Sequence, residues 1–597
     1  MNAHEKPLTV VSIHSDIDPS VALIRDGRVS RFAEEERFTR IKHAPGRFPT
    51  RALRWALADA GVDPDEVDVV AVNWDLDRFG SGAIEAHYAA MRSRYPLDGG
   101  TLAWQRRNIA RYDRAAYVDT LARHWRRTLA KPLKARVVSM GHHYAHAFHS
   151  YALSGFEDAV ALTIDGSGDD ECTVVWECRG RELRPIRRIL MPHSLGWFYA
   201  AITEYLGFEA YDGEYKVMGL ASYAKPDAEL RERLLNVLTP GSPADPDYAV
   251  DGRYIHWGAH TWSDRFTDAL VDLLGRPPRH AHEEVETWHA SLAATAQALV
   301  EDAVLTLVGW ALQETGLDRV CIGGGVGLNI KMNRRVYDAP GVRDLFCNPL
   351  CGDGGAPVGA ALAACFDQGG RWPEPLPTLA LGVAVEAQEI DTLVRECGLL
   401  THRPKNLEDI VAGMLAQGAL VGWVQGRFEA GPRALGQRSI LASPVGVDAR
   451  ERVNRAVKYR EPWRPFCPSL PREAADMYLA RWRDSPFMVM AFDATEAMRS
   501  AAPAVVHVDG TVRVQLVDRE HLPRFHKLLE AFGERTGTPV LLNTSFNLSG
   551  EPIVATARDA VRTFFSSALD ILVLGDTIVV KRPEQAARLA ALDGAST

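Results

Sequence analysis

The sequence predicts an α/β protein with two domains. Apolar strands at 8–13 and 21–24 enclose a polar turn, and the same pattern returns at 158–164 and 172–177. A segment at 366–377 is rich in Pro and Gly and has no periodicity, so it is expected to link this duplicated region to a second α/β region. The chain has 597 residues, several times the usual length of one domain, and at least two large cores are therefore expected.

We place the first domain at 1–370 and the second at 371–597. Within the first, the repeated strand, turn and strand predicts two related halves with a ligand cleft between them. A long amphipathic helix is expected at 288–315 and a strand at 319–322. In the second domain the expected strands are 419–424, 503–508, 512–517, 538–542 and 571–580, and the expected helices are 406–416 and 521–534.

The charge balance argues against nucleic acid as a partner. Lys and Arg number 68 and Asp and Glu 77, a net charge of −9, whereas nucleic-acid affinity depends on clustered basic residues. The N-terminus does not resemble a signal peptide, no stretch reaches the roughly 18 apolar residues of a membrane span, and the eight cysteines lack zinc-site spacing. We expect a reduced, cytoplasmic protein without a membrane partner, for which a homodimer is possible.

A histidine-rich run at 141–149, GHHYAHAFH, contains a candidate metal site. His142 and His146 are four residues apart, so on a helix their imidazoles project from one face, about 6 Å apart. The alternative is a histidine-rich helical turn packed in a core. Asp353 is available as a third ligand in a Gly-rich turn that precedes an Ala-rich helix, although such turns are also common as purely structural features.

Two further Gly-rich turns predict a nucleotide site, because small residues let the backbone approach a phosphate. Alone, each could be a tight turn. Together with the duplicated strands they resemble the acetate and sugar kinase, Hsc70 and actin superfamily, whose two related halves clamp a nucleotide. The candidate nucleotide-binding residues in these turns and in the turn before Asp353 are Asp165, Gly166, Gly168, Gly323, Gly324, Asn329 and Gly352.

In the second domain, the run VKYREPWRPF at 457–466 brings Lys458, Arg460 and Arg464 close together between aromatic residues and prolines. A cationic run is usually a solvated face. The interleaved aromatic residues favour instead the wall of a pocket for a phosphorylated or carboxylated small ligand. The polar run NTSFN at 543–547 follows a predicted strand and is a second candidate wall.

Eight motifs, spread over nearly the whole chain, resemble the O-carbamoyltransferases of antibiotic and nodulation-factor biosynthesis. They are AEEERFTRIKHAPGRFP (33–49), HHYAHA (142–147), GEYKVMGLA (213–221), GGGVGLN (323–329), GDGGAPVGAAL (352–362), EAGPRALGQRSILASP (429–444), VKYREPWRPF (457–466) and NTSFNLSGEPIV (543–554). The resemblance implies a first domain similar to the universal tRNA threonylcarbamoylation ATPase and a YrdC-like second domain.

The resemblance also implies the chemistry. The YrdC-like domain would combine carbamoyl phosphate with ATP to give carbamoyl-adenylate and pyrophosphate, and the first domain would pass the carbamoyl group to a hydroxyl of a small acceptor, releasing AMP. His142, His146 and Asp353 match the metal ligands of the family, which usually hold iron(II). The positions that match its nucleotide and phosphate contacts are Lys458, Arg460, Arg513, Ser545 and Asn547, and Lys216 lies within another of its motifs.

Three residues are candidates for the transfer step itself. His14 follows the first strand and could act as general base toward the acceptor hydroxyl, since an imidazole has a suitable pKa. Lys42 could balance the anionic adenylate, and it is one of only 11 lysines in the chain. Family members commonly have a Gly before the first His and an Asp directly after it, whereas this chain reads SIHSDIDPS at that place. Asp16, two residues after His14, either takes the place of that Asp or is displaced from it.

Four alternatives share parts of this pattern. A sugar or acetate kinase would produce ADP, and an Hsc70-like protein would hydrolyse ATP slowly without carbamoyl phosphate. A tRNA-modifying enzyme is disfavoured by the net charge of −9. A hydrogenase maturation enzyme would need an acylphosphatase segment and zinc-finger cysteine pairs, which we do not find in the sequence.

Overall fold

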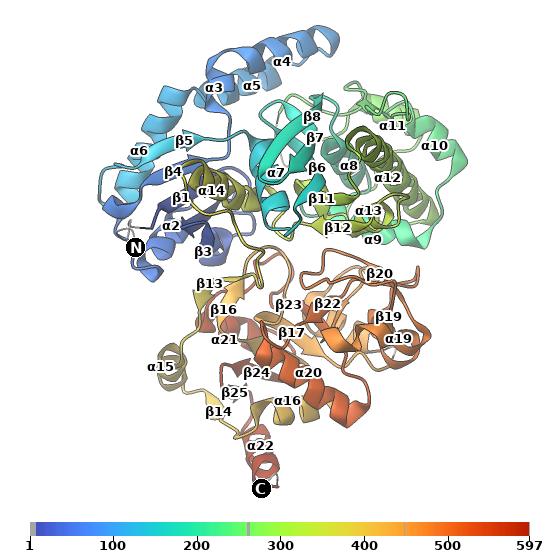
Figure 1. The fold of residues 1–597 in the computed structure, drawn as a ribbon. Coiled ribbons are helices and arrows are strands. Elements are labelled where there is room, and N and C mark those ends of the chain that lie inside the picture. Colours follow the sequence, from blue (N-terminus) through green and yellow to red (C-terminus); the bar gives the residue numbers. More distant parts are fainter. Residues whose placement is uncertain (1–6, 260–262, 447, 596–597) are drawn as a thin grey trace. The chain divides into compact units, whose positions relative to one another are not determined.

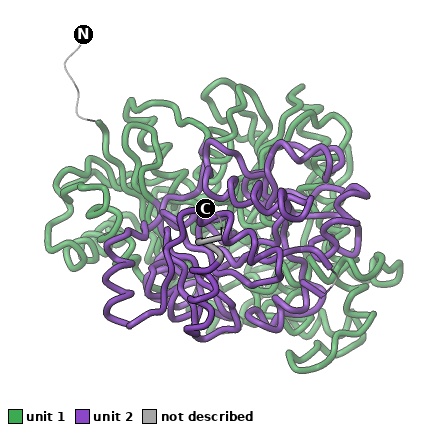
Figure 2. The backbone as a smooth tube through the Cα atoms, turned by 90° about the horizontal axis from the view of Figure 1, so that it is seen from below, with its two compact units in different colours: residues 1–31, 46–375 green, residues 32–45, 376–597 purple. Residues whose placement is uncertain are grey.

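The computed structural model describes residues 7–259, 263–446 and 448–595, and the chain divides into two compact units. Unit 1 contains Met1–Arg31 and Gly46–Pro375, and unit 2 contains Phe32–Pro45 and Leu376–Thr597. Figure 1 shows the helices and strands of both units, and Figure 2 colours the chain by unit. Both units combine helices with β-sheets, which confirms the predicted α/β class.

Unit 1 is built on two five-stranded sheets with the same topology. In the first sheet the spatial order is β3 (Arg28–Glu34), β2 (Ser20–Arg25), β1 (Thr9–His14), β4 (Val69–Val72), β5 (Arg136–Ser139). In the second sheet it is β8 (Glu182–Leu190), β7 (Glu171–Arg179), β6 (Asp158–Gly168), β11 (Arg319–Gly323), β12 (Asp344–Cys347). In each, the first strand pairs antiparallel with the strand that follows it and parallel with a later one. The predicted duplication is therefore present in the pairing pattern.

The helices of unit 1 lie between and after these strands. They are α2 (Thr50–Asp59), α3 (Leu76–Gly80), α4 (Ala83–Arg94), α5 (Gly99–Arg111), α6 (Arg114–Leu129), α7 (His142–Ala152), α8 (Leu195–Tyr205), α9 (Glu214–Leu220), α10 (Ala228–Leu234), α11 (Asp268–Leu274), α12 (Thr287–Thr315), α13 (Ile330–Tyr337) and α14 (Ala356–Asp367). A short hairpin, β9 (Leu238–Thr239) with β10 (Ala249–Val250), completes the unit.

The longest helix, α12, agrees with the predicted range 288–315 and ends at Gly316, whose left-handed backbone (φ 70°) stops the helix. Among the residues that the structure describes, it is the one helix that is long and apolar enough to cross a membrane. However, 72% of its most apolar window is buried inside the structure, as in the core helix of a globular unit. The cytoplasmic location and the homodimer stay predictions.

Helices α7 and α14 pack closely against each other in unit 1. Gly359 on α14 makes this approach possible, because a Cβ at that position would lie 1.9 Å from the carbonyl oxygen of Ala145 on α7. The small side chains of the Ala-rich α14 thus let the beginnings of the two helices approach each other. His142 and His146 lie on α7, and Asp353 lies in the 3-10 turn that directly precedes α14.

Unit 2 is built on one eight-stranded sheet. Its spatial order is β14 (Leu400–His402), β25 (Thr577–Val580), β24 (Ile571–Leu574), β15 (Val421–Val424), β17 (Arg438–Ala442), β23 (Leu541–Ser545), β18 (Cys467–Pro471), β22 (Gln515–Val517). Smaller pairings are β13 (Ala380–Ala384) with β16 (Arg427–Glu429), and β19 (Leu479–Ala480), β20 (Phe492–Ala494) and β21 (Thr511–Val512).

The helices of unit 2 are α1 (Glu36–Thr39), α15 (Ala387–Cys397), α16 (Leu407–Ala416), α17 (Ala449–Val453), α18 (Ala475–Tyr478), α19 (Glu496–Ala501), α20 (Pro523–Thr536), α21 (Ala557–Phe565) and α22 (Pro583–Ala595). The core lies between the large sheet and α16 and α20, where Trp423 and Phe532 are fully buried. Both helices were predicted within two residues of their observed ends.

The division into units differs from the predicted boundary in one respect. The chain passes from one unit to the other at Pro375, near the predicted 370, but residues 32–45 belong to unit 2 rather than to the first domain. The cause is a set of long-range hydrogen bonds: the Arg37 guanidinium donates to the carbonyl of Gly431 (2.6 Å), and the Arg40 guanidinium donates to the carbonyls of Pro552 and Ile553 (2.6 Å each).

The expected strand at 503–508 was wrong. Pro503–Val505 form a 3-10 helix, which the fixed φ of Pro503 favours at its first position. The other expected strands are present with shifted ends; 512–517 is split between β21 and β22, and 571–580 is a hairpin of β24 and β25.

Candidate functional site

A buried cluster of two imidazoles and two carboxylates lies in unit 1. The Nε2 atoms of His142 and His146 are 3.0 Å apart. Asp165 Oδ2 lies 3.2 Å from the His146 nitrogen and 3.7 Å from the His142 nitrogen, and Asp353 Oδ1 lies 4.0 and 3.7 Å from them. One ligand atom from each of the four residues lies within 4.8 Å of the others, so the four can surround a single metal ion.

Three chain segments meet to form this cluster. Both histidines lie on the first turns of α7, Asp165 lies in the last part of β6, and Asp353 begins the 3-10 turn that leads into α14. Gly168 makes room for the His142 ring, because a Cβ there would lie 2.1 Å from His142 Cδ2. The predicted ligands His142, His146 and Asp353 are therefore brought together, and Asp165, which we expected to contact a nucleotide, has its carboxylate in the same cluster.

The electrostatics of the cluster favour a bound cation. Burial lowers the pKa of His142, but its interactions with the carboxylates of Asp165 and Asp353 outweigh this and raise the pKa to about 10. Burial raises the pKa of Asp165, but the two imidazoles hold it well below its usual range. The buried carboxylate of Asp165 and the half-buried carboxylate of Asp353 thus favour positive charge beside them. Two nitrogen and two oxygen donors suit a divalent transition metal.

His14 lies at the end of β1 and is fully buried, beside the metal-ligand cluster. Its Nδ1 is 3.3 Å from Asn73 Oδ1, and the amide nitrogen of Asn73 is also 3.5 Å from His142 Nδ1. The Trp74 ring lies near both imidazoles, with its centroid 6.1 Å from that of His14 and 4.9 Å from that of His142.

Asp16 is held by basic and phenolic groups. Its carboxylate accepts hydrogen bonds from the Arg111 guanidinium and the Tyr112 hydroxyl. Burial raises the pKa of Asp16, but the interactions with Arg111, His14 and Tyr112 together outweigh burial and lower it below the usual value. Asp16 is therefore an ionised partner of Arg111, and its carboxylate is less basic than a free one.

Three glycines of the predicted nucleotide turns in unit 1 are closely packed or have a left-handed backbone. Gly166 is packed against Trp197, and Gly323 against Ser150; a Cβ would lie 2.8 Å from Trp197 Nε1 in the first case and 2.4 Å from Ser150 Oγ in the second. Gly324 has a left-handed backbone (φ 82°). These glycines are therefore also required by packing or by backbone conformation, whether or not a phosphate binds beside them.

Three other candidates lie on neighbouring elements of unit 1. Asn329 accepts a hydrogen bond from the backbone of Met332 at the start of α13 and bonds with Gln297. Lys216 lies on α9, with its ammonium 5.5 Å from the centre of the Phe208 ring. A Cβ at Gly352 would meet no atom within 4 Å, so the turn before Asp353 leaves space there.

In unit 2, Lys458 joins two of the predicted motifs. Its buried ammonium donates to Asn547 Oδ1 (2.7 Å), to Ser545 Oγ (3.1 Å) and to the backbone carbonyls of Ser545 and Asn547. Arg460 approaches the same strand, with a guanidinium nitrogen 3.5 Å from Ser545 Oγ. A π-helical turn at Asn454–Lys458, followed by the left-handed Tyr459 (φ 47°), directs Lys458 inward.

Positive charge dominates the surroundings of Lys458. Its pKa is lowered well below 10.5 by burial first and then by repulsion from Arg460, Arg464 and Lys42. Lys42 belongs to the segment 32–45 of unit 2, whereas His14 and Asp16 belong to unit 1. The three residues predicted for the transfer step are thus not in one unit, and the charge of Lys42 acts on Lys458.

Arg513 lies between β21 and β22 of unit 2, and its Nε donates to the sulfur of Cys467 (2.8 Å). Cys467 pairs with Asn543 across β18 and β23, two residues before Ser545. Arg513 therefore lies near the same strand as the Lys458 contacts, but it is not among the charges that lower the pKa of Lys458.

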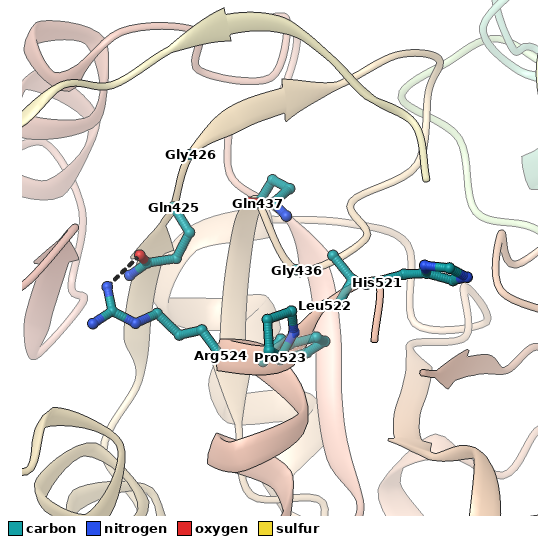
Figure 3. Close-up of a pocket in the computed structure, with 9 residues that line it drawn as sticks. Gln425, Gly426, Gly436, Gln437, His521, Leu522, Pro523 and Arg524 are labelled. Carbon is teal, nitrogen blue, oxygen red and sulfur yellow. Dashed lines mark hydrogen bonds between the residues drawn. The ribbon is translucent and has the colours of Figure 1, made fainter. Parts of the chain in front are cut away.

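A pocket of about 210 Å³ opens elsewhere in unit 2, at the start of α20 (Figure 3). Arg524 donates a hydrogen bond to Gln425 Oε1 at its edge (3.0 Å). The lining residues are Gln425, Gly426, Gly436, Gln437, His521, Leu522, Pro523, Arg524 and Phe525. None of the predicted site residues lines this pocket, so its volume is no guide to the chemistry.

Sequence reasoning missed two residues of unit 1 that support the histidine cluster. Asp169 accepts hydrogen bonds from the backbone of His142 (3.0 Å) and of Asp75 (2.9 Å), and burial raises its pKa to about 6. Asn73 follows β4 directly. The sequence did contain a signal for Asn73: it directly follows the buried strand 69–72, and the carboxyl ends of parallel strands are where binding sites form.

The fold and the cluster define a class: a two-unit α/β protein with a duplicated sheet topology and a candidate metal centre at the beginnings of α7 and α14. Within that class the chain belongs to the carbamoyltransferase family. Residues 10–362 match the carbamoyltransferase N-terminus, and residues 412–581 match the carbamoyltransferase C-terminus.

Several relatives are similar over long stretches. The chain is 33% identical to nodulation protein NolNO of Sinorhizobium fredii over 96% of its own length and 81% of that protein. It is 36% identical to nodulation protein NolO of Bradyrhizobium diazoefficiens over 74% of its length and 79% of that protein. It is 35% identical to 3'-hydroxymethylcephem-O-carbamoyltransferase of Amycolatopsis lactamdurans over 43% of its length and 48% of that protein.

Among solved structures, HypF of T. kodakarensis is similar over 61% of this chain and 49% of that one, with 14% identity and a TM-score of 0.31. The ROK hexokinase of Thermus thermophilus is similar over 61% of this chain and 99% of that one, with 14% identity and a TM-score of 0.28.

Proposed function

We propose that the protein is an ATP-dependent O-carbamoyltransferase that works in two steps. Unit 2 forms carbamoyl-adenylate, and unit 1 transfers the carbamoyl group to a hydroxyl of a small natural product. The observation that carries the proposal is the presence, within one member of the carbamoyltransferase family, of two chemically different centres: the cations around Lys458 and the histidine and aspartate cluster around His142.

The first step needs concentrated positive charge. Carbamoyl phosphate and ATP are both polyanions and repel each other, so cations must hold them together. Lys458, Arg460 and Arg464 supply that charge, and Lys42 adds to it. Water first releases phosphate from carbamoyl phosphate and leaves carbamate. A carbamate oxygen then attacks the α-phosphorus of ATP, pyrophosphate leaves, and carbamoyl-adenylate is formed.

The second step suits the cluster in unit 1. His142, His146, Asp165 and Asp353 would hold a divalent metal, for which we propose iron(II), and this metal would supply Lewis-acid stabilisation of negative charge. The buried His14 would accept the proton of the acceptor hydroxyl as that oxygen attacks the carbamoyl carbon and the bond to AMP breaks. The turns at Gly166, Gly323 and Asn329 are proposed to face the nucleotide.

The acceptor class is proposed from the relatives. One of them is named for a hydroxymethylcephem, an antibiotic skeleton, and others are nodulation proteins. We therefore expect a hydroxyl on a small natural product, probed by incubating candidate compounds with ATP and carbamoyl phosphate. A carbamoyl group that replaces a proton adds about 43 Da without adding charge.

The products distinguish this function from the alternatives. We expect AMP, pyrophosphate, phosphate and a carbamoylated acceptor, with no carbamoylated acceptor unless carbamoyl phosphate is present. Formation of ADP and a phosphorylated acceptor would instead establish a small-molecule kinase, and slow ATP hydrolysis that ignores carbamoyl phosphate would indicate an Hsc70-like protein. Either result would overturn the proposal.

A further inference from the structure

Asn73 lies between the candidate base and a candidate metal ligand. Its side-chain amide nitrogen is 3.2 Å from His14 Nδ1 and 3.5 Å from His142 Nδ1, and all three side chains are fully buried. The strand pairing explains this position. β1 and β4 run parallel with Ser12 opposite Ala71, so the residues two places further on, His14 and Asn73, leave the same edge of the sheet side by side.

The metal cluster dictates which proton His142 carries. Its Nε2 faces His146, Asp165 and Asp353, so this is the nitrogen that would bind a metal. A neutral imidazole that binds a metal through Nε2 carries its proton on Nδ1, and that N–H normally donates to a neighbouring acceptor. The Asn73 amide lies 3.5 Å from His142 Nδ1 and is placed to take this role.

Both ends of the amide lie near His14, since the amide oxygen is also 3.3 Å from His14 Nδ1, but only the end assigned as nitrogen faces His142. The chemical identity of the end that faces His142 therefore decides the tautomer of that ring. If that end is the NH₂ group, it donates to His142 Nδ1, and the proton of His142 is placed on the metal-facing Nε2. If that end is the oxygen, it can accept from the Nδ1–H groups of both rings, since an amide oxygen has two lone pairs. Both Nε2 atoms are then free, one for a metal and one for a substrate proton.

We propose that Asn73 is a positioning residue whose carboxamide oxygen accepts the Nδ1–H of both His142 and His14. In this arrangement one side chain fixes the tautomers of both the metal ligand and the base. When the His142 Nε2 is unprotonated and able to bind a metal, the His14 Nε2 is also unprotonated and able to accept a proton. Trp74, the next residue, packs against both rings and limits their rotation. The proposal rests on the proposed function for the role of His14, but its consequence for metal affinity does not.

The test compares two substitutions that differ in hydrogen bonding. Asn73→Asp keeps an acceptor at this position and loses the NH₂ donor, whereas Asn73→Leu loses both at similar size. Titration of the metal-free full chain with Fe²⁺, or with Co²⁺ as a spectroscopic probe, measures the cluster without any carbamoyl chemistry. We expect Asn73→Leu to lower metal affinity about 10- to 100-fold and Asn73→Asp to stay close to the parent protein.

A second readout follows the transfer step. Asn73→Leu is expected to lower kcat for the acceptor about 10- to 100-fold with little change in KM, while pyrophosphate release in unit 2 stays at the parent rate; Asn73→Asp should restore kcat. Ser12→Ala is the matched control, because Ser12 is fully buried on β1 and its hydroxyl has no hydrogen-bond partner among the described residues. It should change neither metal affinity nor transfer.

Two outcomes would overturn the inference. Unchanged metal affinity in Asn73→Leu would show that the amide does not set the His142 tautomer, and an Asn73→Asp protein as weak as Asn73→Leu would show that the NH₂ end is the one in use. If Asn73→Leu does not fold, Asn73→Ala makes the same comparison. A protein that carbamoylates nothing but shows these metal affinities would contradict the proposed function and leave the role of Asn73 toward the metal in place.

Discussion

The surroundings of Lys458 oppose the charged form of its side chain, and this predicts that ligand binding in unit 2 takes up a proton. Burial, Arg460, Arg464 and Lys42 together lower the pKa of Lys458 well below 10.5. A bound phosphate would reverse the balance. At an effective dielectric constant near 20, one negative charge about 4 Å from the ammonium contributes about 4 kcal/mol, or roughly three pKa units.

The assay is isothermal titration of the whole protein with ATP and with carbamoyl phosphate, in buffers of different ionisation enthalpy. At a pH between the lowered pKa of Lys458 and 10.5, we expect uptake approaching one proton per bound polyanion. Lys458→Met should remove this uptake and slow pyrophosphate release by about 10²- to 10³-fold, the loss typical of one preorganised donor. Lys405→Met, an exposed lysine of the same unit, is the control.

The same pKa shift has a consequence for stability. Between the lowered pKa and 10.5 the unfolded chain holds a proton on Lys458 that the folded chain does not, so the free energy of unfolding rises with pH over this window. The slope is at most about 1.4 kcal/mol per pH unit and should disappear in Lys458→Met. Equal proton uptake and equal slopes in the parent protein and Lys458→Met would refute the reasoning.

Three further predictions concern unit 1. His142→Ala should abolish metal binding and carbamoyl transfer and retain carbamoyl-phosphate-dependent pyrophosphate release; unchanged metal content by elemental analysis would contradict the cluster. Gly168→Ala should lower metal affinity, because its Cβ would lie 2.1 Å from His142 Cδ2, whereas Gly309→Ala, with no atom within 4 Å, should not. Gly359→Ala, which forces α14 away from α7, should cost about 1–3 kcal/mol of unfolding free energy in urea.

Local patterns account for the parts of the structure that the sequence could predict. The 3.6-residue periodicity of 287–315 and its terminal glycine define α12 without reference to the rest of the chain. The spacing of His142 and His146 likewise needs only the geometry of α7 to place both imidazoles on one face. The rings lie closer together than the expected distance of about 6 Å, with centroids 4.7 Å apart and Nε2 atoms 3.0 Å apart. Such features depend on neighbours within a few turns of chain.

Features that depend on distant segments could not be read in the same way. Asp165 and Asn73 reach the site because β6 and β4 end at the same sheet edges as other strands, and a single sequence does not reveal strand order. The run 503–508 has the β-branched residues of a strand, yet Pro503 begins a 3-10 helix, since β-propensity depends strongly on context. The placement of 32–45 rests on hydrogen bonds that span more than 390 residues.

That placement changes how charge is divided between the proposed steps. With Lys42 in unit 2, four cations act at the centre that would hold two polyanions, whereas the unit 1 cluster has two carboxylates that a divalent metal would neutralise. An adenylate carries a single phosphate charge, so its transfer needs less positive charge than its synthesis does. The charge of Lys42 therefore favours assigning the segment 32–45 to the proposed adenylate-forming centre rather than to the proposed transfer site. Lys42→Met should accordingly lower the rate of pyrophosphate release more than the rate at which a carbamoyl group is transferred from adenylate that is already formed.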